Sequence, residues 1–224
     1  MSDGTGRGRG LVIFDCDGVL VDTMAIDMRE LTRAIAEAGG TMSPQEVSAA
    51  FYGVALSDIQ REVEGHLGRP LPDAWMERFL AERAAVFERE LRPVPGARAA
   101  LDGVRAAGWE TCIASGGAHA KMELTLRVTG LGDAVPADRI FSAYDVARPK
   151  PAPDLFLHAA ATCGFPREAC VVVEDSIPGA TAGLAAGMRT FGFANGDAVR
   201  AAHLAALGTE PLAALRDLPS LLAR

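Results

Sequence analysis

Two aspartates stand at the end of a short hydrophobic run near the start of the sequence. Asp15 and Asp17 close the segment LVIFDCD and are separated only by Cys16. Two carboxylates this close repel each other, so the arrangement is unfavourable unless a cation or a proton separates their charges. The spacing therefore indicates a chemical role for the acids or for the cysteine between them.

Further residues that could do chemistry follow or precede other hydrophobic runs. Ser115 and Gly116 follow WETCIA, Lys150 lies in RPKPAPD, Glu174 ends CVVVE, and Asp175 follows it. Lysine is rare in this chain, which has two lysines and 20 arginines among its 22 basic residues. Each lysine is therefore more informative than it would be in an average protein.

Alternating elements are expected to position these residues. Apolar runs predict strands at 10–15, 109–114, 139–142, 170–174 and 189–193. Helical patterns separate them at 97–107, 118–130, 153–164 and 177–187, and two more helices are expected at the end of the chain. This alternation predicts an α/β fold with a doubly wound parallel sheet. Ligands bind such sheets at the carboxyl ends of the strands, where the acids, Ser115 and Lys150 should converge.

Residues 24–90 have a purely helical pattern with no strand signal, which indicates an insertion after the first strand. SPQE at 43–46 is a capping box, and 72–90 form a long amphipathic helix. We therefore expect a three-layer, Rossmann-like core domain of residues 10–22 and 92–224. An all-helical cap domain of residues 23–91 is inserted in it, and residues 1–9 form a flexible tail.

The acids at the predicted sheet edge require positive charge. A ligand set made only of oxygens favours a hard cation such as Mg²⁺. Ser115 and Gly116 stand where a helix begins, and free backbone N–H groups there favour phosphate. Lys150 adds a point charge for an anionic oxygen. These residue types predict a bound phosphoryl group, because phosphoryl transfer depends mainly on such charge stabilisation.

Composition excludes several classes of partner. The net charge of −7 and the pI near 5.1 argue against a nucleic-acid or anionic-membrane surface. We find no apolar run long enough for a membrane span and no signal-peptide stretch, and the four cysteines form no CxxC pair. We expect a cytoplasmic protein with reduced cysteines. The sequence gives no indication of oligomeric state, and a monomer is assumed.

Four motifs in order resemble those of the haloacid dehalogenase-like superfamily, in its phosphatase branch with a helical cap. They are DCDGV at 15–19, the IAS that ends in Ser115, RPKPAPD with Lys150, and VVVEDSIPGA with Glu174 and Asp175. The resemblance spans nearly the whole chain, and it implies the α/β core, the helical cap and a Mg²⁺-dependent reaction on a small phosphorylated substrate.

The resemblance also implies a role for each site residue. Asp15 would be the nucleophile that becomes an aspartyl-phosphate, and Asp17 the general acid and base. Asp15, the backbone carbonyl of Asp17 and Asp175 would bind Mg²⁺, with Glu174 either ligating the ion or supporting its ligands. Ser115, the Gly116 amide and Lys150 would hold the phosphate.

The sequence argues against several other activities. A thiol phosphatase needs an arginine six residues after its cysteine, but Asp22 follows Cys16 at that distance, so Cys16 is expected to be a packing residue. The resembling dehalogenases lack the second acid, and the phosphonate-cleaving branch uses a cap lysine, which 24–90 do not contain. The β-phosphoglucomutase type carries an arginine where GVAL (53–56) has Leu56, which favours a hydrolase. A mutase and a non-catalytic phosphometabolite-binding module remain the alternatives.

Substrate identity is less constrained by the sequence. We expect a phosphorylated sugar, sugar acid or polyol, selected by cap residues within 48–62. Tyr52, Asp58 and Arg61 are candidates for contacts with the leaving group.

Overall fold

The computed structural model describes residues 9–51, 54 and 56–223. The chain separates into two compact units. The first consists of Met1–Val21 with Pro93–Arg224, and the second is Asp22–Arg92. Of the predicted tail, residues 1–9, only Arg9 lies among the described residues.

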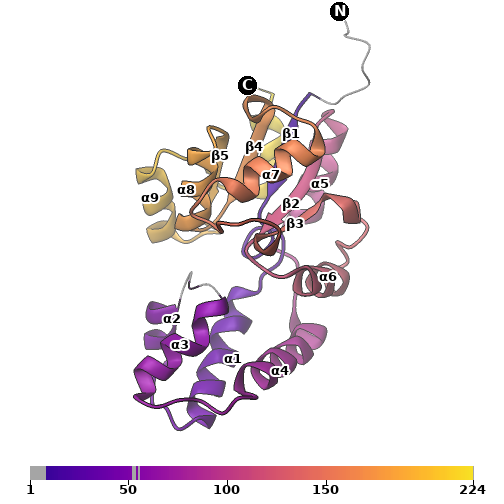
Figure 1. Ribbon diagram of the computed structural model, residues 1–224. Helices are drawn as coiled ribbons and strands as arrows, with labels where there is room; N and C mark the ends of the chain where they lie inside the picture. The colour runs from indigo at the N-terminus through magenta and orange to yellow at the C-terminus, as the bar shows by residue number, and fades with distance from the viewer. Residues whose placement is uncertain (1–8, 52–53, 55, 224) are drawn as a thin grey trace, which may run out of the picture. The chain divides into compact units, whose positions relative to one another are not determined.

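Parallel strands form the centre of the first unit. They are β1 (Leu11–Phe14), β2 (Glu110–Ser115), β3 (Ile140–Ser142), β4 (Cys170–Glu174), β5 (Arg189–Phe193) and β6 (Glu210–Leu212). Every strand pairs in parallel with its neighbours in the order β3-β2-β1-β4-β5-β6. This order confirms the predicted doubly wound α/β fold (Figure 1).

Both faces of the central strands are buried. Leu11 and Ile13 of β1 pack in one cluster with residues of α7 (Asp154–Cys163) and α8 (Ile177–Ala185). Val12 and Phe14 point to the opposite face and have no exposed surface. Strands covered on both faces have near-continuous apolar sequences, which explains why LVIF and CVVV carry no polar alternation.

The other helices of this unit flank the strands. α5 (Ala97–Ala106) packs on β2, α6 (His119–Val128) contacts β3, and α9 (Ala198–Ala206) contacts β5 and β6. α10 (Leu218–Leu221) packs on α5. This unit also contains short 3₁₀ turns, which are η1 (Ala137–Arg139), η2 (Ala143–Asp145), η3 (Arg167–Ala169) and η4 (Leu215–Asp217).

The end of the chain differs from the prediction of two helices alone, because β6 lies between α9 and α10. Its sequence, Glu-Pro-Leu, lacks a hydrophobic run and has a proline at its centre. Proline cannot donate to a sheet and is tolerated on an edge strand, which is the position of β6. A three-residue edge strand of this kind leaves no periodic signal in the sequence.

The second unit is helical, as its sequence pattern predicts. Its helices are α1 (Met24–Glu37), α2 (Pro44–Phe51), α3 (Leu56–Leu67) and α4 (Trp75–Glu90). The predicted capping box is confirmed, since the Glu46 amide donates to Ser43 Oγ and the Ser43 amide donates to Glu46 Oε2. The core gathers large apolar side chains from all four helices, including Leu31, Phe51, Val63 and Phe79.

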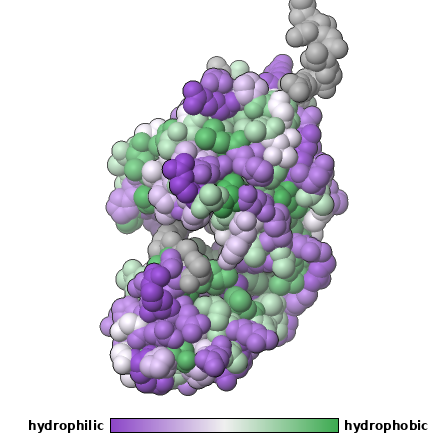
Figure 2. All heavy atoms as spheres, viewed as in Figure 1, coloured by the Kyte–Doolittle hydropathy of each residue, from purple (hydrophilic) through white to green (hydrophobic). Residues whose placement is uncertain are grey.

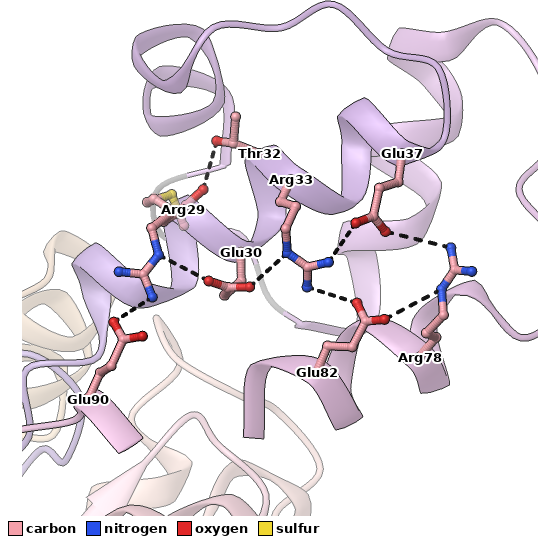
Figure 3. A network of polar contacts seen from close by, with 9 residues as sticks. Arg29, Glu30, Thr32, Arg33, Glu37, Arg78, Glu82 and Glu90 are labelled. Atoms are coloured by element: carbon pink, nitrogen blue, oxygen red, sulfur yellow. Dashed lines mark hydrogen bonds and ion pairs between the residues drawn. The ribbon is translucent and has the colours of Figure 1, made fainter. Parts of the chain in front are cut away.

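A chain of ion pairs joins α1 to α4 (Figure 3). Arg33 of α1 is its centre and donates to Glu30, Glu37 and Glu82 at 3.0, 2.6 and 2.8 Å. Arg29 extends the chain to Glu90 of α4 at 2.8 Å. Because Glu30 is buried, its pairing with the two arginines offsets the cost of removing a carboxylate from water.

Hydrophilic residues are spread over the visible face of each unit (Figure 2). In the part of the chain that the structure describes, no helix combines the length and apolarity required to cross a membrane.

Candidate active site

The acids of the first and last motifs meet where the strand order reverses. Phe14 of β1 lies opposite Val173 of β4, and the Asp15 amide donates to the Val173 carbonyl at 2.9 Å. Asp15, directly after β1, is thereby placed next to Glu174, the last residue of β4. This is the crevice at the carboxyl ends of the strands in which doubly wound folds bind ligands.

Lys150 lies between these two acids. Its Nζ is 2.6 Å from Asp15 Oδ1 and 2.6 Å from Glu174 Oε1, and it donates to the Ala114 carbonyl at 3.1 Å. The ammonium also lies 4.8 Å from the centroid of the Phe156 ring. One lysine thus links the carboxyl ends of β1, β2 and β4, although 135 residues separate it from Asp15.

Burial shifts the pKa values of Asp15 and Lys150. The pKa of Asp15 is raised to about 7. Burial is the largest cause, the charge of Lys150 opposes it, and the negative charges of Glu174 and Asp17 add to it. Burial alone would lower the pKa of Lys150, but the Asp15 and Glu174 carboxylates raise it above its ordinary value. Lys150 therefore remains charged, and the charge on Asp15 depends on the positive charge around it.

Asp175 packs against the loop that follows β1. Burial raises its pKa well above the ordinary value, with Glu174 and Asp15 adding to the effect, while Arg200 and Lys150 oppose it. Arg200 Nη1 is 3.2 Å from Asp175 Oδ2. Gly18 has a φ of +81°, and a Cβ there would lie 2.2 Å from Asp175 Oδ2. Only glycine allows the loop to approach this carboxylate so closely.

Asp17 has a cation of its own. Lys121 Nζ lies 3.0 Å from Oδ1 and 3.0 Å from Oδ2 of Asp17. Cys16, between the two aspartates, is fully buried, and burial raises the pKa of its thiol well above the ordinary value. A buried thiol of this kind is a poor nucleophile, in agreement with the packing role expected for Cys16.

The loop between β2 and α6 presents backbone N–H groups. Ser115 is buried, and its Oγ accepts a hydrogen bond from the Gly117 amide at 3.2 Å. Ser142 Oγ donates to the Gly117 carbonyl at 2.7 Å and fixes the loop from β3. A Cβ at Gly116 would meet no atom within 4 Å, and the N-cap residue of α6, Ala118, has no side-chain cap. The loop is therefore an open helix N-terminus of the kind that binds anions.

Glu174 is held entirely by the protein. Its Oε2 accepts from the Ser176 amide and from Ser176 Oγ, both at 2.9 Å, and its Oε1 accepts from Lys150. A Cβ at Gly179 of α8 would lie 1.7 Å from Glu174 Oε1, so α8 packs closely against this carboxylate. Both oxygens are used, and Glu174 fixes the position of Lys150.

The residues of this edge fit a hard divalent cation. Asp15, Asp17, Glu174 and Asp175 offer only oxygen, and the cations paired with them, Lys121, Lys150 and Arg200, leave one more negative than positive charge. Burial and mutual repulsion raise the pKa of both Asp15 and Asp175, so a cation between them would be stabilising. Asp15 and Glu174 share Lys150, Asp17 pairs with Lys121 and Asp175 pairs with Arg200. The described residues contain no group of three or more His, Cys, Asp or Glu arranged to hold a metal.

The family follows from a match over most of the chain. Residues 10–187 match the model of the haloacid dehalogenase-like hydrolases. The chain belongs to this family. The chain is 38% identical over 183 residues to the 6-phosphogluconate phosphatase of Escherichia coli K12, covering 81% of each protein. It is 32% identical over 178 residues to hexitol phosphatase A of the same organism, covering 78% of each.

A solved haloacid dehalogenase family hydrolase also resembles this one. The crystal structure from Deinococcus radiodurans R1, with bound phosphate and sodium, aligns with a TM-score of 0.77 and 30% identity, and the match covers 96% of this chain and 95% of that one. The predicted family, the α/β fold and the assignment as a hydrolase are thus confirmed.

Sequence reasoning did not assign three residues that contact the site. Lys121 and Arg200 contact the motif acids Asp17 and Asp175, and Ser142 contacts Gly117 in the loop after Ser115. The rarity of lysine was a signal for Lys121, since both lysines of the chain pair with motif acids. Arg200 and Ser142 had no comparable signal among many arginines and serines.

The residues expected to select the substrate are described only in part. Tyr52 lies outside the described residues, as do Gly53 and Ala55 of the GVAL segment. Arg61 pairs with Asp58 at 2.8 Å and with Glu62 at 3.2 Å on α3.

Proposed function

We propose that this haloacid dehalogenase-like hydrolase is a Mg²⁺-dependent phosphatase that forms an aspartyl-phosphate on Asp15. The observation that carries the proposal is the position of Asp15. It is buried at the reversal of strand order, held by Lys150, with the open 115–117 loop at the end of the neighbouring strand. A carboxylate removed from water and surrounded by phosphate-binding groups is placed to attack phosphorus.

Each residue has a role in this reaction. Ser115, the Gly116 amide and Lys150 hold the phosphoryl oxygens while an Asp15 oxygen forms a bond to phosphorus. Asp17 donates a proton to the leaving oxygen, and the phosphorus–oxygen bond of the ester breaks. Asp17 then accepts a proton from the water that attacks the aspartyl-phosphate, and phosphate leaves with Asp15 restored.

The proposed ligands of Mg²⁺ are Asp15, the backbone carbonyl of Asp17 and Asp175. When bound, the cation neutralises charge on the phosphoryl group and the acids. Glu174 has a supporting role in this proposal, because its two oxygens are already hydrogen-bonded within the protein. Asp175 would exchange part of its contact with Arg200 for the cation.

The substrate class is proposed from the relatives. The two named phosphatases act on 6-phosphogluconate and on hexitol phosphates, by their names, so we propose a sugar, sugar-acid or polyol phosphate for this chain. We propose that Asp22–Arg92, the helical unit, acts as a cap domain that selects among these substrates. We also propose a cytoplasmic monomer that binds neither nucleic acid nor membranes.

The test is a hydrolysis screen of purified protein with Mg²⁺ against about a hundred phosphorylated metabolites. We expect phosphate release from one or a few sugar-type phosphates. Asp15→Asn should lower the rate by about 10³-fold or more, and EDTA should abolish activity reversibly. Arg105→Met, a change on the exposed part of α5, is the control. Release from no ester in the screen would contradict the proposal.

Two other results identify the alternatives. Conversion of a hexose 1-phosphate to the 6-phosphate without phosphate release would indicate a mutase, despite Leu56. Tight binding of a phosphometabolite with no turnover would indicate a binding module.

A further inference from the structure

Three of the four cysteines of this chain lie on one face of the sheet. Cys112 of β2 and Cys170 of β4 belong to the apolar cluster between the strands and α7, and Cys163, the last residue of α7, packs against the same cluster. All three are free thiols, and the proposed reaction uses none of them. Because thiols are readily oxidised, the arrangement of this cluster decides what oxidation would produce.

The sheet register keeps Cys112 and Cys170 apart. Cys112 lies opposite Ile13 of β1, and Cys170 lies opposite Leu11 on the other side of the same strand. Two strand spacings and an offset of two residues separate their Cα atoms by more than about 10 Å. A disulfide requires a Cα separation of about 4.4–6.8 Å, so these two thiols cannot be joined without movement of the backbone. A disulfide within the cluster must therefore include Cys163.

The thiol of Cys163 is joined to that of Cys112. A hydrogen bond between the two thiols shifts the pKa of both groups. The Cys170 thiol is directed elsewhere, since its Sγ donates to the Pro166 carbonyl at 3.3 Å. The pair that can react together is thus Cys112 and Cys163, from the packed elements β2 and α7.

The two thiols of this pair differ in access and in charge. Cys112 is fully buried, and burial raises the pKa of its thiol well above the ordinary value. Cys163 is only partly buried. The hydrogen bond with Cys112 lowers the pKa of Cys163; burial opposes this, the charge of Arg139 adds to it, and Asp138 and Glu110 act against it. A partly exposed thiol beside a cation is the reactive kind, so Cys163 should react first.

We propose that Cys163 is the residue at which hydrogen peroxide oxidises this protein, and that Cys112 then converts the product to a Cys112–Cys163 disulfide. The Cys163 sulfur bonds to a peroxide oxygen, the O–O bond breaks, and water leaves with the thiol proton. The Cys112 sulfur then bonds to the Cys163 sulfur, the S–O bond of the sulfenic acid breaks, and a second water leaves with the Cys112 proton. One peroxide is reduced and two thiols are oxidised. The disulfide stops oxidation at a level that thiol reductants reverse, before a sulfinic acid forms.

The test maps the oxidised cysteines directly. Trypsin cleaves after lysine and arginine but not before proline, so it places Cys112 on 106–121, Cys163 on 140–167 and Cys170 on 168–189. The reduced whole chain is treated with about ten equivalents of hydrogen peroxide and digested without reductant. We expect the intact mass to fall by two hydrogen atoms, 106–121 to be cross-linked to 140–167, and dithiothreitol to reverse both changes.

Two variants separate the roles of the cysteines. Cys112→Ala removes the second thiol, so the sulfenic acid of Cys163 should persist and be captured by dimedone on 140–167. Cys170→Ala is the matched control, because it removes another buried cysteine of the cluster, and it should form the cross-link as wild type does. Thermal unfolding checks the fold of both variants, and the wild-type map decides the proposal if either does not fold.

Three results would overturn the inference. They are oxidation of Cys163 to a sulfinic acid with Cys112 still free, a cross-link to the peptide of Cys170 or between two chains, and no oxidation at all. The phosphatase proposal stands or fails separately, because hydrolysis of phosphate esters by the reduced protein does not depend on these thiols.

Discussion

At the scale of single residues, the site is a set of buried charges that the fold holds in fixed pairs. Asp15 and Glu174 share Lys150, Asp17 faces Lys121, and Asp175 faces Arg200. The acids could be expected at this edge because they stand at or shortly after the carboxyl ends of β1 and β4 and because the motif order is specific. The partners Lys121 and Arg200 were not predicted, because they lie 104 and 25 residues from Asp17 and Asp175 and the local spacing of the motifs does not indicate such contacts.

The raised pKa of Asp15, about 7, has a consequence for stability. The folded protein binds more protons than the unfolded chain between about pH 4, the unfolded value, and about pH 7, so the free energy of unfolding falls as pH rises through this window. Asp15→Asn removes this contribution. In metal-free protein we expect the stability of the variant relative to wild type to increase by up to about 4 kcal/mol from about pH 4 to about pH 7.5, because one pKa unit corresponds to about 1.4 kcal/mol.

Urea denaturation in EDTA at several pH values measures this difference. Comparison with wild type at each pH cancels the contributions of Asp175 and other acids to a first approximation. A difference that does not change with pH would show that Asp15 is ionised throughout.

At the scale of elements, hydrophobic runs predicted the strands well. β4 and β5 have the predicted bounds, 170–174 and 189–193. For β4 the reason is that a strand buried on both faces has a nearly continuous apolar sequence. β6 was not predicted, because its three residues include Pro211 and form no apolar run. The open loop before α6 could be anticipated from Ser115 and Gly116, but its anchoring by Ser142 depends on the pairing of β2 with β3.

The ion pairs between α1 and α4 should contribute to the stability of the helical unit. Arg33→Met removes three pairs at once and leaves the buried Glu30 with Arg29 alone. We expect the free energy of unfolding to fall by about 1 kcal/mol, with a smaller loss at high salt, because exposed pairs contribute little and are screened. Chemical denaturation followed by circular dichroism measures it.

Arg89→Met is the matched control, since Arg89 is an exposed arginine on α4, the helix that the network joins to α1. Equal stability of the two variants would show that the network around Arg33 contributes nothing beyond the loss of a surface charge.

At the scale of the whole molecule, the chain leaves the sheet unit and returns to it at neighbouring points. Val21 pairs with Pro93 in an antiparallel bridge, and the Val94 amide donates to the Leu20 carbonyl at 2.9 Å. A long helical segment can thus be inserted after β1 without separating it from β2 and β4. The all-helical pattern of 24–90 reveals this insertion in the sequence, whereas the role of the inserted helices depends on side chains that no motif specifies.

The central claim is that Asp15 attacks phosphorus, and trapping the intermediate tests it most directly. Protein quenched during turnover of its best substrate with Mg²⁺ is treated with borohydride, which reduces an aspartyl-phosphate to homoserine, and its peptides are mapped by mass spectrometry. We predict homoserine at position 15 and at no other aspartate. Sustained turnover with no modification at position 15, or with modification at another residue, would contradict the account.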